Sequence, residues 1–146
     1  MAATRRATAV WEGGLAKGSG RFNVESGAIG EQEVTWASRT ERSEGKTSPE
    51  ELLAAAEASC FSMALSHILG EGGNPPDRLE VSAACTIDQV GDGFKVTTME
   101  IDVRGRVDGI DGPAFEKAAS EAAENCPISG ALKGNVEISV NATLDG

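Results

Sequence analysis

Two cysteines, Cys60 and Cys126, have settings in this sequence that suggest chemistry. Cys60 lies inside a long apolar stretch, Thr47–Gly70, where a free cysteine can simply be a small core residue. Burial raises the pKa of a thiol, so a reactive Cys60 needs a cation close to it. Residues 47–70 contain no lysine or arginine, so any such cation must come from another part of the fold.

Cys126 precedes Pro127, where the sequence predicts the N-terminal edge of a short helical turn. Backbone N–H groups exposed at such an edge stabilise a thiolate. The alternative is a loop cysteine without a role. The third cysteine, Cys85, alternates in phase with Val81 and Ile87 on a predicted strand. Core packing explains it, and we assign it no role.

Other common kinds of site are poorly supported. His67 follows Cys60 by seven residues, about 10 Å along a helix, which is too far for a direct cysteine–histidine pair. The cysteines and the single histidine lack the CxxC or HxxxH spacing of a zinc site. The phosphate-binding glycine patterns and the GxSxG nucleophile motif are also missing.

The cysteine helix has clear start and stop signals. Ser48 can cap it, Pro49 suits its first position, and Glu51 completes a capping box with Ser48. Gly70 is expected to end it. Cys60 belongs to a set of residues that recur at helical spacing and predict one apolar stripe: Leu53, Ala56, Cys60, Met63, Ala64 and His67.

The remaining elements predict an α+β fold in a single domain, residues 1–146. A small antiparallel meander precedes the cysteine helix, and a long hairpin, a second helix, a short helical turn and a last strand follow it. The expected ranges are strands at 4–12, 21–25 and 34–39, a hairpin at 79–90 and 94–107, a helix at 114–124, a turn to 132 and a strand at 136–144.

Composition narrows the possible partners. The net charge of −10 argues against nucleic acid and against an anionic membrane, because both need a basic face. No secretory signal is evident, and we expect no segment of membrane-spanning length. Three cysteines cannot form a closed disulfide set, so a reducing, cytoplasmic location is expected.

Three segments carry a resemblance to a known family: TSPEEL at 47–52, ASCFSMAL at 58–65 and CPIS at 126–129. With the weaker matches at 8–13 and 17–27, they resemble the OsmC/Ohr family of thiol-dependent hydroperoxide reductases, and the OsmC branch most closely. The resemblance covers nearly the whole chain. It implies the OsmC-like fold, in which antiparallel sheets surround a long central cysteine-bearing helix in an intertwined homodimer with two sites at the subunit interface.

The resemblance also implies roles for individual residues. Cys60 matches the peroxidatic cysteine and Cys126 the resolving cysteine. Glu50 matches the site glutamate, and Arg39, which we expect at the end of a strand, matches the arginine of the OsmC branch. Arg21 competes for that arginine role because the other branch takes its arginine from the first glycine-rich region. Two simpler explanations remain open: Glu50 only complements the helix dipole, and Arg39 is only a solvated residue at the end of a strand.

Helix geometry bears on how such a site could form. On one straight helix, Glu50 and Cys60 are about 15 Å apart and differ by about 80° in azimuth. The two residues therefore share a site only if a neighbouring copy supplies one of them, or if the helix bends sharply. A site that uses both predicts a homodimer.

The mechanism implied by the resemblance is a two-cysteine peroxidase cycle with an antioxidant role in oxidative stress. Arg39, oriented by Glu50, would hold Cys60 as a thiolate that attacks an organic hydroperoxide, and Cys126 would then form the disulfide. An external dithiol, such as a lipoyl-bearing protein, would reduce that disulfide, with no metal or bound organic cofactor. Two alternatives stay open: a non-enzymatic redox sensor or stress-binding protein with the same thiol pair, and an inert domain with buried thiols.

Overall fold

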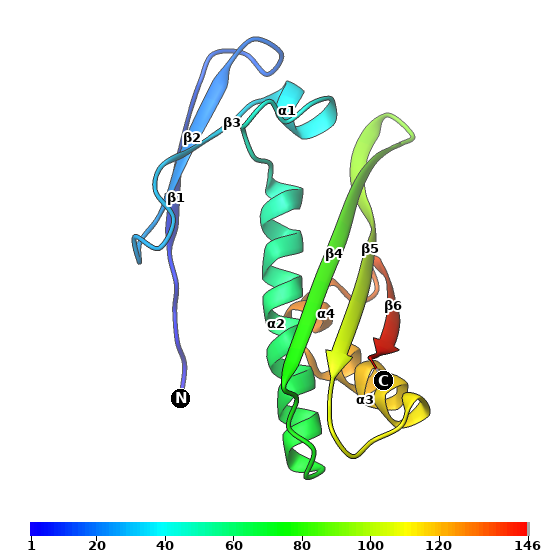
Figure 1. Ribbon diagram of the computed structural model, residues 1–146. Helices are drawn as coiled ribbons and strands as arrows, with labels where there is room; N and C mark the ends of the chain where they lie inside the picture. The colour runs from blue at the N-terminus through cyan, green and yellow to red at the C-terminus, as the bar shows by residue number, and fades with distance from the viewer. Residues whose placement is uncertain (146) are drawn as a thin grey trace. The chain divides into compact units, whose positions relative to one another are not determined.

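The computed structural model describes residues 1–145 (Figure 1). Two compact units divide the chain within one helix, the first being Met1–Leu52 and the second beginning at Leu53. The assignment of residues 1–146 to one OsmC-like domain stays a prediction. The α+β composition is confirmed, with one three-stranded sheet before the long helix and another after it.

The first unit contains the expected antiparallel meander. Its strands are β1 (Ala7–Glu12), β2 (Ser19–Val24) and β3 (Gln32–Val34), and they pair in the order β1-β2-β3. Every residue of β1 is exposed, including the large apolar side chains of Val10 and Trp11. This sheet therefore presents apolar surface that the described chain leaves uncovered.

The expected strand at 34–39 is wrong for most of its length. Its segment forms the short helix α1 (Trp36–Thr40) instead. The Thr35 hydroxyl accepts a hydrogen bond from the Ser38 N–H, and the Ser38 hydroxyl accepts one from the Thr35 N–H, each at 2.9 Å. This capping box starts a helix where a strand was expected. Arg39 therefore lies in the last turn of a helix, not at a strand end.

The cysteine helix is confirmed as α2 (Pro49–Glu71), one residue longer at its end than Gly70 predicts. The Ser48 hydroxyl accepts from the Glu51 N–H at 3.1 Å, as a cap should. The Glu51 carboxylate accepts from the Thr47 hydroxyl at 2.7 Å. The start of α2 is thus fixed by side chains immediately around it.

The apolar stripe predicted along α2 faces the core only in part: Leu53 and Ala64 pack against it, but the most buried side chains are others. The buried side chains of α2 beyond Leu53 are Glu57, Phe61, Leu65 and Leu69. Met63, a member of the predicted stripe, is 71% exposed, and His67 is also exposed. The helix is rich in alanine and apolar on most of its circumference, so helical spacing alone does not select the buried face.

The length and composition of α2 also correct another expectation. By length and composition alone, this 23-residue helix could cross a membrane. The expectation that no segment reaches membrane-spanning length is therefore wrong. Only 22% of its apolar window is buried within the chain. Much of the apolar surface of α2 is therefore not buried by this chain.

The second unit packs a sheet against helices. Strands β4 (Arg78–Val90) and β5 (Gly93–Arg106) form the predicted antiparallel hairpin. Strand β6 (Glu137–Leu144) pairs with β5 in parallel, so the expectation of wholly antiparallel sheets is wrong for this one. The helices after the hairpin are α3 (Gly112–Asn125) and α4 (Pro127–Leu132), close to their expected ranges. Cys85 lies on the partly buried face of β4 and packs against the core, as predicted.

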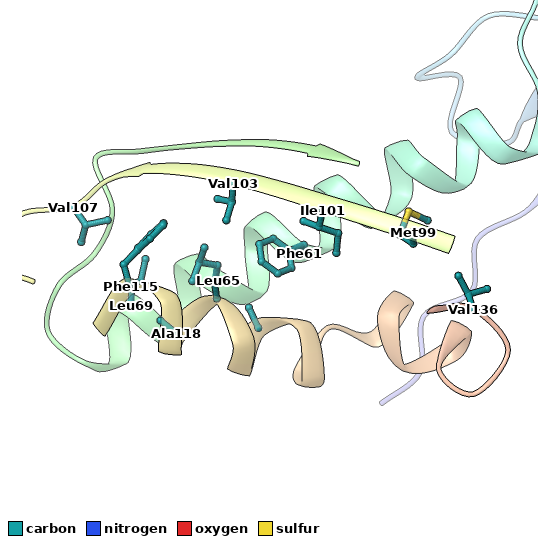
Figure 2. Packing of buried hydrophobic residues seen from close by; sticks show 12 residues of the cluster. Phe61, Leu65, Leu69, Met99, Ile101, Val103, Val107, Phe115, Ala118 and Val136 are labelled. Carbon is teal, nitrogen blue, oxygen red and sulfur yellow. The ribbon is translucent and has the colours of Figure 1, made fainter. Parts of the chain in front are cut away.

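The core of this unit lies between β5, α2 and α3. Figure 2 shows Ile101 and Val103 of β5 near Phe61 and Leu65 of α2, with Phe115 of α3 close by. These side chains are 2% exposed or less. This packing fixes the position of the middle of α2 relative to α3. It therefore also fixes where Cys60 lies along α3.

Candidate active site

Cys60 and Cys126 meet in the second unit. The Cys126 thiol donates a hydrogen bond to the Cys60 sulfur, and the two Sγ atoms are 2.8 Å apart. A disulfide bond is about 2.05 Å long, so a small movement would join them. Cys126 is buried, whereas Cys60 is partly exposed. A small molecule from solvent can therefore reach Cys60 first.

Two helix ends fix the position of Cys126. Its N–H donates to the Ala122 carbonyl at 2.8 Å and closes α3, and its carbonyl accepts from the Gly130 N–H at 2.9 Å and opens α4. The backbone at Cys126 is extended, which the following Pro127 favours. The sulfur is thus presented from a tight turn between α3 and α4.

The surroundings of Cys60 disfavour its thiolate. Burial and the hydrogen bond with Cys126 raise its pKa above the ordinary value, and the charge of Glu57 adds to this. The N–H of Ile128 in α4 acts in the opposite direction by hydrogen bonding to the Cys60 sulfur. We expected the N–H groups of this turn to act on Cys126, but this one acts on Cys60. Among the described residues, no lysine or arginine contributes to the Cys60 pKa.

A second contact joins the same two segments. The Ser129 hydroxyl donates a short hydrogen bond to Glu57 Oε1, and both residues are almost completely buried. Sequence reasoning missed this pair. Glu57 is a carboxylate among alanines, three residues before Cys60, and Ser129 follows Cys126 by three. A charged residue inside an apolar helix was the signal that could have singled out Glu57, although not its partner.

Arg39 and Glu50 form a bidentate pair within the first unit. Arg39 Nε and Nη2 donate to Glu50 Oε1 and Oε2, each at 2.9 Å. The guanidinium also lies 5.9 Å from the ring centroid of Trp36. Glu50 is 6% exposed, so the pair is held in a partly dry setting. The bidentate contact fixes the orientation of the guanidinium.

The competing arginine has different partners. Arg21 lies on β2 and contacts Glu12 at 3.2 Å and Glu31 at 3.8 Å. Its side chain is 41% exposed. The contact with Glu50 therefore belongs to Arg39, as the resemblance to the OsmC branch implies; the catalytic role of either arginine stays a prediction.

An apolar cavity of about 530 Å³ opens beside Cys60. Its walls come from one side of α2 and from the turn that carries Cys126: Met63, Ala64, His67, Ile68, Asn125 and Pro127. Within residues 1–145, no three histidine, cysteine or acidic side chains are grouped so that they could hold a metal ion. The cavity brings an apolar surface up to the Cys60 side chain.

A family model described as "OsmC-like protein" matches residues 42–141, which include every residue of the site except Arg39. The chain is also 37% identical to "Peroxiredoxin OsmC" of Escherichia coli over 138 residues, which covers 94% of this chain and 96% of that protein. The chain belongs to the OsmC-like family. The expectation drawn from the three segments around Glu50, Cys60 and Cys126 is confirmed.

Solved structures have the same fold as this OsmC-like chain. An OsmC-like protein from Mycoplasma pneumoniae aligns with a TM-score of 0.76 over 100% of both chains, at 14% identity. The organic hydroperoxide resistance protein OhrB of Bacillus subtilis aligns with a TM-score of 0.72 over 94% of this chain and 98% of that chain, at 24% identity. The fold is therefore OsmC-like, with the long helix α2 bearing Cys60.

Proposed function

We propose that this OsmC-like chain is a thiol-dependent peroxidase that reduces organic hydroperoxides to alcohols. The observation that carries the proposal is the 2.8 Å approach of the Cys60 and Cys126 sulfurs. One is partly exposed and the other is buried beside it. An exposed thiol that reacts first and a neighbouring thiol that follows are the parts of a two-cysteine peroxidase.

The proposed cycle has three balanced steps. The Cys60 thiolate attacks the outer oxygen of ROOH, the O–O bond breaks, and a proton on the leaving oxygen gives ROH and the Cys60 sulfenic acid. The Cys126 thiol then attacks that sulfur, forming the disulfide and releasing water. An external dithiol exchanges with the disulfide, leaves as its own cyclic disulfide, and returns both thiols.

A second copy of the chain supplies the missing cation in this proposal. The environment of Cys60 disfavours the thiolate, while the guanidinium of Arg39 is fixed by Glu50 at the beginning of α2. Cys60 follows Glu50 by ten residues on one continuous helix. Arg39 of the partner subunit would therefore lower the Cys60 pKa, and Glu50 of the partner subunit would orient it.

The exposed apolar surface supports the same assembly. Most of the apolar window of α2 is unburied, and Val10, Trp11 and Leu15 expose large side chains in the first unit. Removing such apolar surface from water by contact with another protein surface is favourable in free energy. In the proposed homodimer each copy covers α2 of the other, so that both sites lie at the interface.

The substrate and the reductant follow from the surroundings of Cys60. The cavity beside it is lined mainly by apolar atoms, which suits a hydroperoxide with a hydrocarbon tail. Several curated relatives carry the name organic hydroperoxide resistance protein. The proposed reductant is a dithiol, such as a lipoyl group on another protein, which can reach the disulfide through the exposed Cys60 side.

We place the reaction in the cytoplasm, because its disulfide has to be reduced in each cycle and a reducing compartment supplies dithiols. The proposal is tested by consumption of cumene hydroperoxide with dithiothreitol as reductant. Wild type is expected to turn over repeatedly, and Cys60→Ser not at all. If Cys60→Ser consumes the peroxide at the wild-type rate, Cys60 is not the nucleophile and the proposal fails.

A further inference from the structure

Glu57 is a buried carboxylate to which the proposed cycle gives no task. Its side chain is 0% exposed, and Oε1 accepts the hydrogen bond of the Ser129 hydroxyl. Oε2 has no hydrogen-bond partner among the described residues. A buried carboxylate with one oxygen unpaired is costly, so a specific role is needed to explain it.

The two contacts between α2 and the turn after α3 have the same spacing on both segments. Glu57 precedes Cys60 by three residues on α2, and Ser129 follows Cys126 by three. Residues three apart on a helix lie on the same side, one turn from each other. Cys60–Cys126 and Glu57–Ser129 are therefore two neighbouring links across the same interface.

Helix α4 is joined to α2 by the Glu57–Ser129 link and by the hydrogen bond of the Ile128 N–H to the Cys60 sulfur. It has only six residues, too few to be stable as an isolated helix. Ser129 is its one buried residue within the described chain. The hydrogen bond of Ser129 to Glu57 therefore ties α4, and the Cys126 turn at its beginning, to α2.

We propose that Glu57 and Ser129 are positioning residues for the disulfide step, which hold Cys126 close enough to capture the Cys60 sulfenic acid before a second peroxide does. The inference rests on the proposed function. A directional hydrogen bond between buried groups fixes distance and orientation more closely than apolar contacts can. With the link intact, the Cys126 thiol attacks Cys60, the S–S bond forms, and water leaves.

The effect of Glu57 on the thiol points to this later step. Its charge is among the causes that raise the Cys60 pKa, after burial and the hydrogen bond with Cys126. Glu57 therefore works against formation of the thiolate that attacks the peroxide. The role that the Ser129 contact gives to Glu57 therefore lies after that attack, in the position of Cys126.

Ser129→Ala provides the direct test, with rapid mixing of the reduced protein and cumene hydroperoxide. Trapping with a sulfenic-acid reagent follows the first step, and loss of free thiols follows the disulfide step. We expect the first step to stay within twofold of wild type. The disulfide step is expected to slow about tenfold, the factor that one ordinary hydrogen bond supplies, and Cys60 sulfinic acid to accumulate.

Two further variants separate positioning from stability. Glu57→Gln keeps an acceptor for Ser129 and is expected to form the disulfide at nearly the wild-type rate. The double variant Glu57→Met/Ser129→Ala removes both polar groups, so its melting temperature should recover towards wild type while the disulfide step stays slow. Ser120→Ala, an exposed serine on α3, is the matched control and should change neither step.

The outcomes distinguish the two proposals. If wild type forms no disulfide after peroxide, both the peroxidase and the positioning role are wrong. If wild type forms it and Ser129→Ala forms it equally fast, only the positioning role is overturned. Recovery of the disulfide rate together with stability in the double variant also overturns it, because Glu57 and Ser129 would then act through stability alone.

Discussion

The Cys60 and Cys126 sulfurs lie 2.8 Å apart although 66 positions separate them in the chain. Each is positioned by different forces. The core residues of α2 set the height of Cys60, and the junction of α3 with α4 presents Cys126. No large rearrangement is required to join them, which is the structural basis for the two-cysteine cycle.

Replacement of Cys126 separates the first step from the rest of the cycle. Cys126→Ser retains Cys60 and should react once with an organic hydroperoxide, giving a Cys60 sulfenic acid that no neighbouring thiol can capture. Excess peroxide then oxidises it to the sulfinic acid, a gain of two oxygen atoms seen by mass spectrometry. Normal repeated turnover with dithiothreitol would remove the resolving role of Cys126.

The cation proposed for Cys60 predicts a shifted pH profile. With Arg39 beside the sulfur the Cys60 pKa falls, so the rate of thiol alkylation should reach its plateau at lower pH. In Arg39→Ala the thiol keeps the raised pKa that burial gives it, and the rate should still climb through alkaline pH. Iodoacetamide labelling of Cys60 across pH measures this.

The control for that experiment is Arg21→Ala, because Arg21 of β2 pairs with Glu12 and Glu31. It should leave the alkylation profile of Cys60 unchanged. A profile that moves with Arg21 and not with Arg39 would transfer the role of the cation to Arg21.

A shared site predicts that two inactive variants restore each other. Cys60→Ser and Arg39→Ala, co-expressed with different tags, form mixed dimers in which one site has both Cys60 and Arg39 of the partner subunit. Peroxidase activity of the mixture should reach about a quarter of wild type, because half of the dimers are mixed and half of their sites are complete. If the mixture has no activity while each variant remains folded and dimeric, the site is built within one chain.

Close packing in the second unit predicts a stability effect at Gly105. A Cβ on Gly105 of β5 would collide with the ring of Phe115, which is fully buried in α3. Gly105→Ala should lower the free energy of unfolding by about 1–3 kcal/mol, measured in urea. Gly93→Ala, on the same strand with open space at its Cβ position, is the control and should be nearly neutral.

The sequence predicted the elements that have strong local signals. Ser48 and Pro49 located the start of α2, and the alternation through Cys85 located β4. The sequence-based predictions were wrong where a segment allowed more than one interpretation. The capping box of Thr35 and Ser38 turned an expected strand into α1, and the apolar circumference of α2 concealed which face is buried.

The candidate site was predictable only in part, and for a physical reason. Cys60, Cys126, Arg39 and Glu50 came from motifs, and the expected contact of Glu50 with Arg39 is present as a bidentate pair. The partnership of Glu57 with Ser129 joins segments 72 residues apart, and no local pattern encodes such a contact. Long-range pairs of this kind require the packed fold.

The most direct test of the account is the identity of the disulfide that peroxide produces. The reduced wild-type protein is treated with one equivalent of cumene hydroperoxide, the remaining thiols are blocked, and non-reduced peptides are mapped by mass spectrometry. We predict a single intramolecular link between Cys60 and Cys126, with Cys85 recovered as a blocked thiol. Peroxide consumption with Cys60 and Cys126 both recovered as blocked thiols would contradict the account.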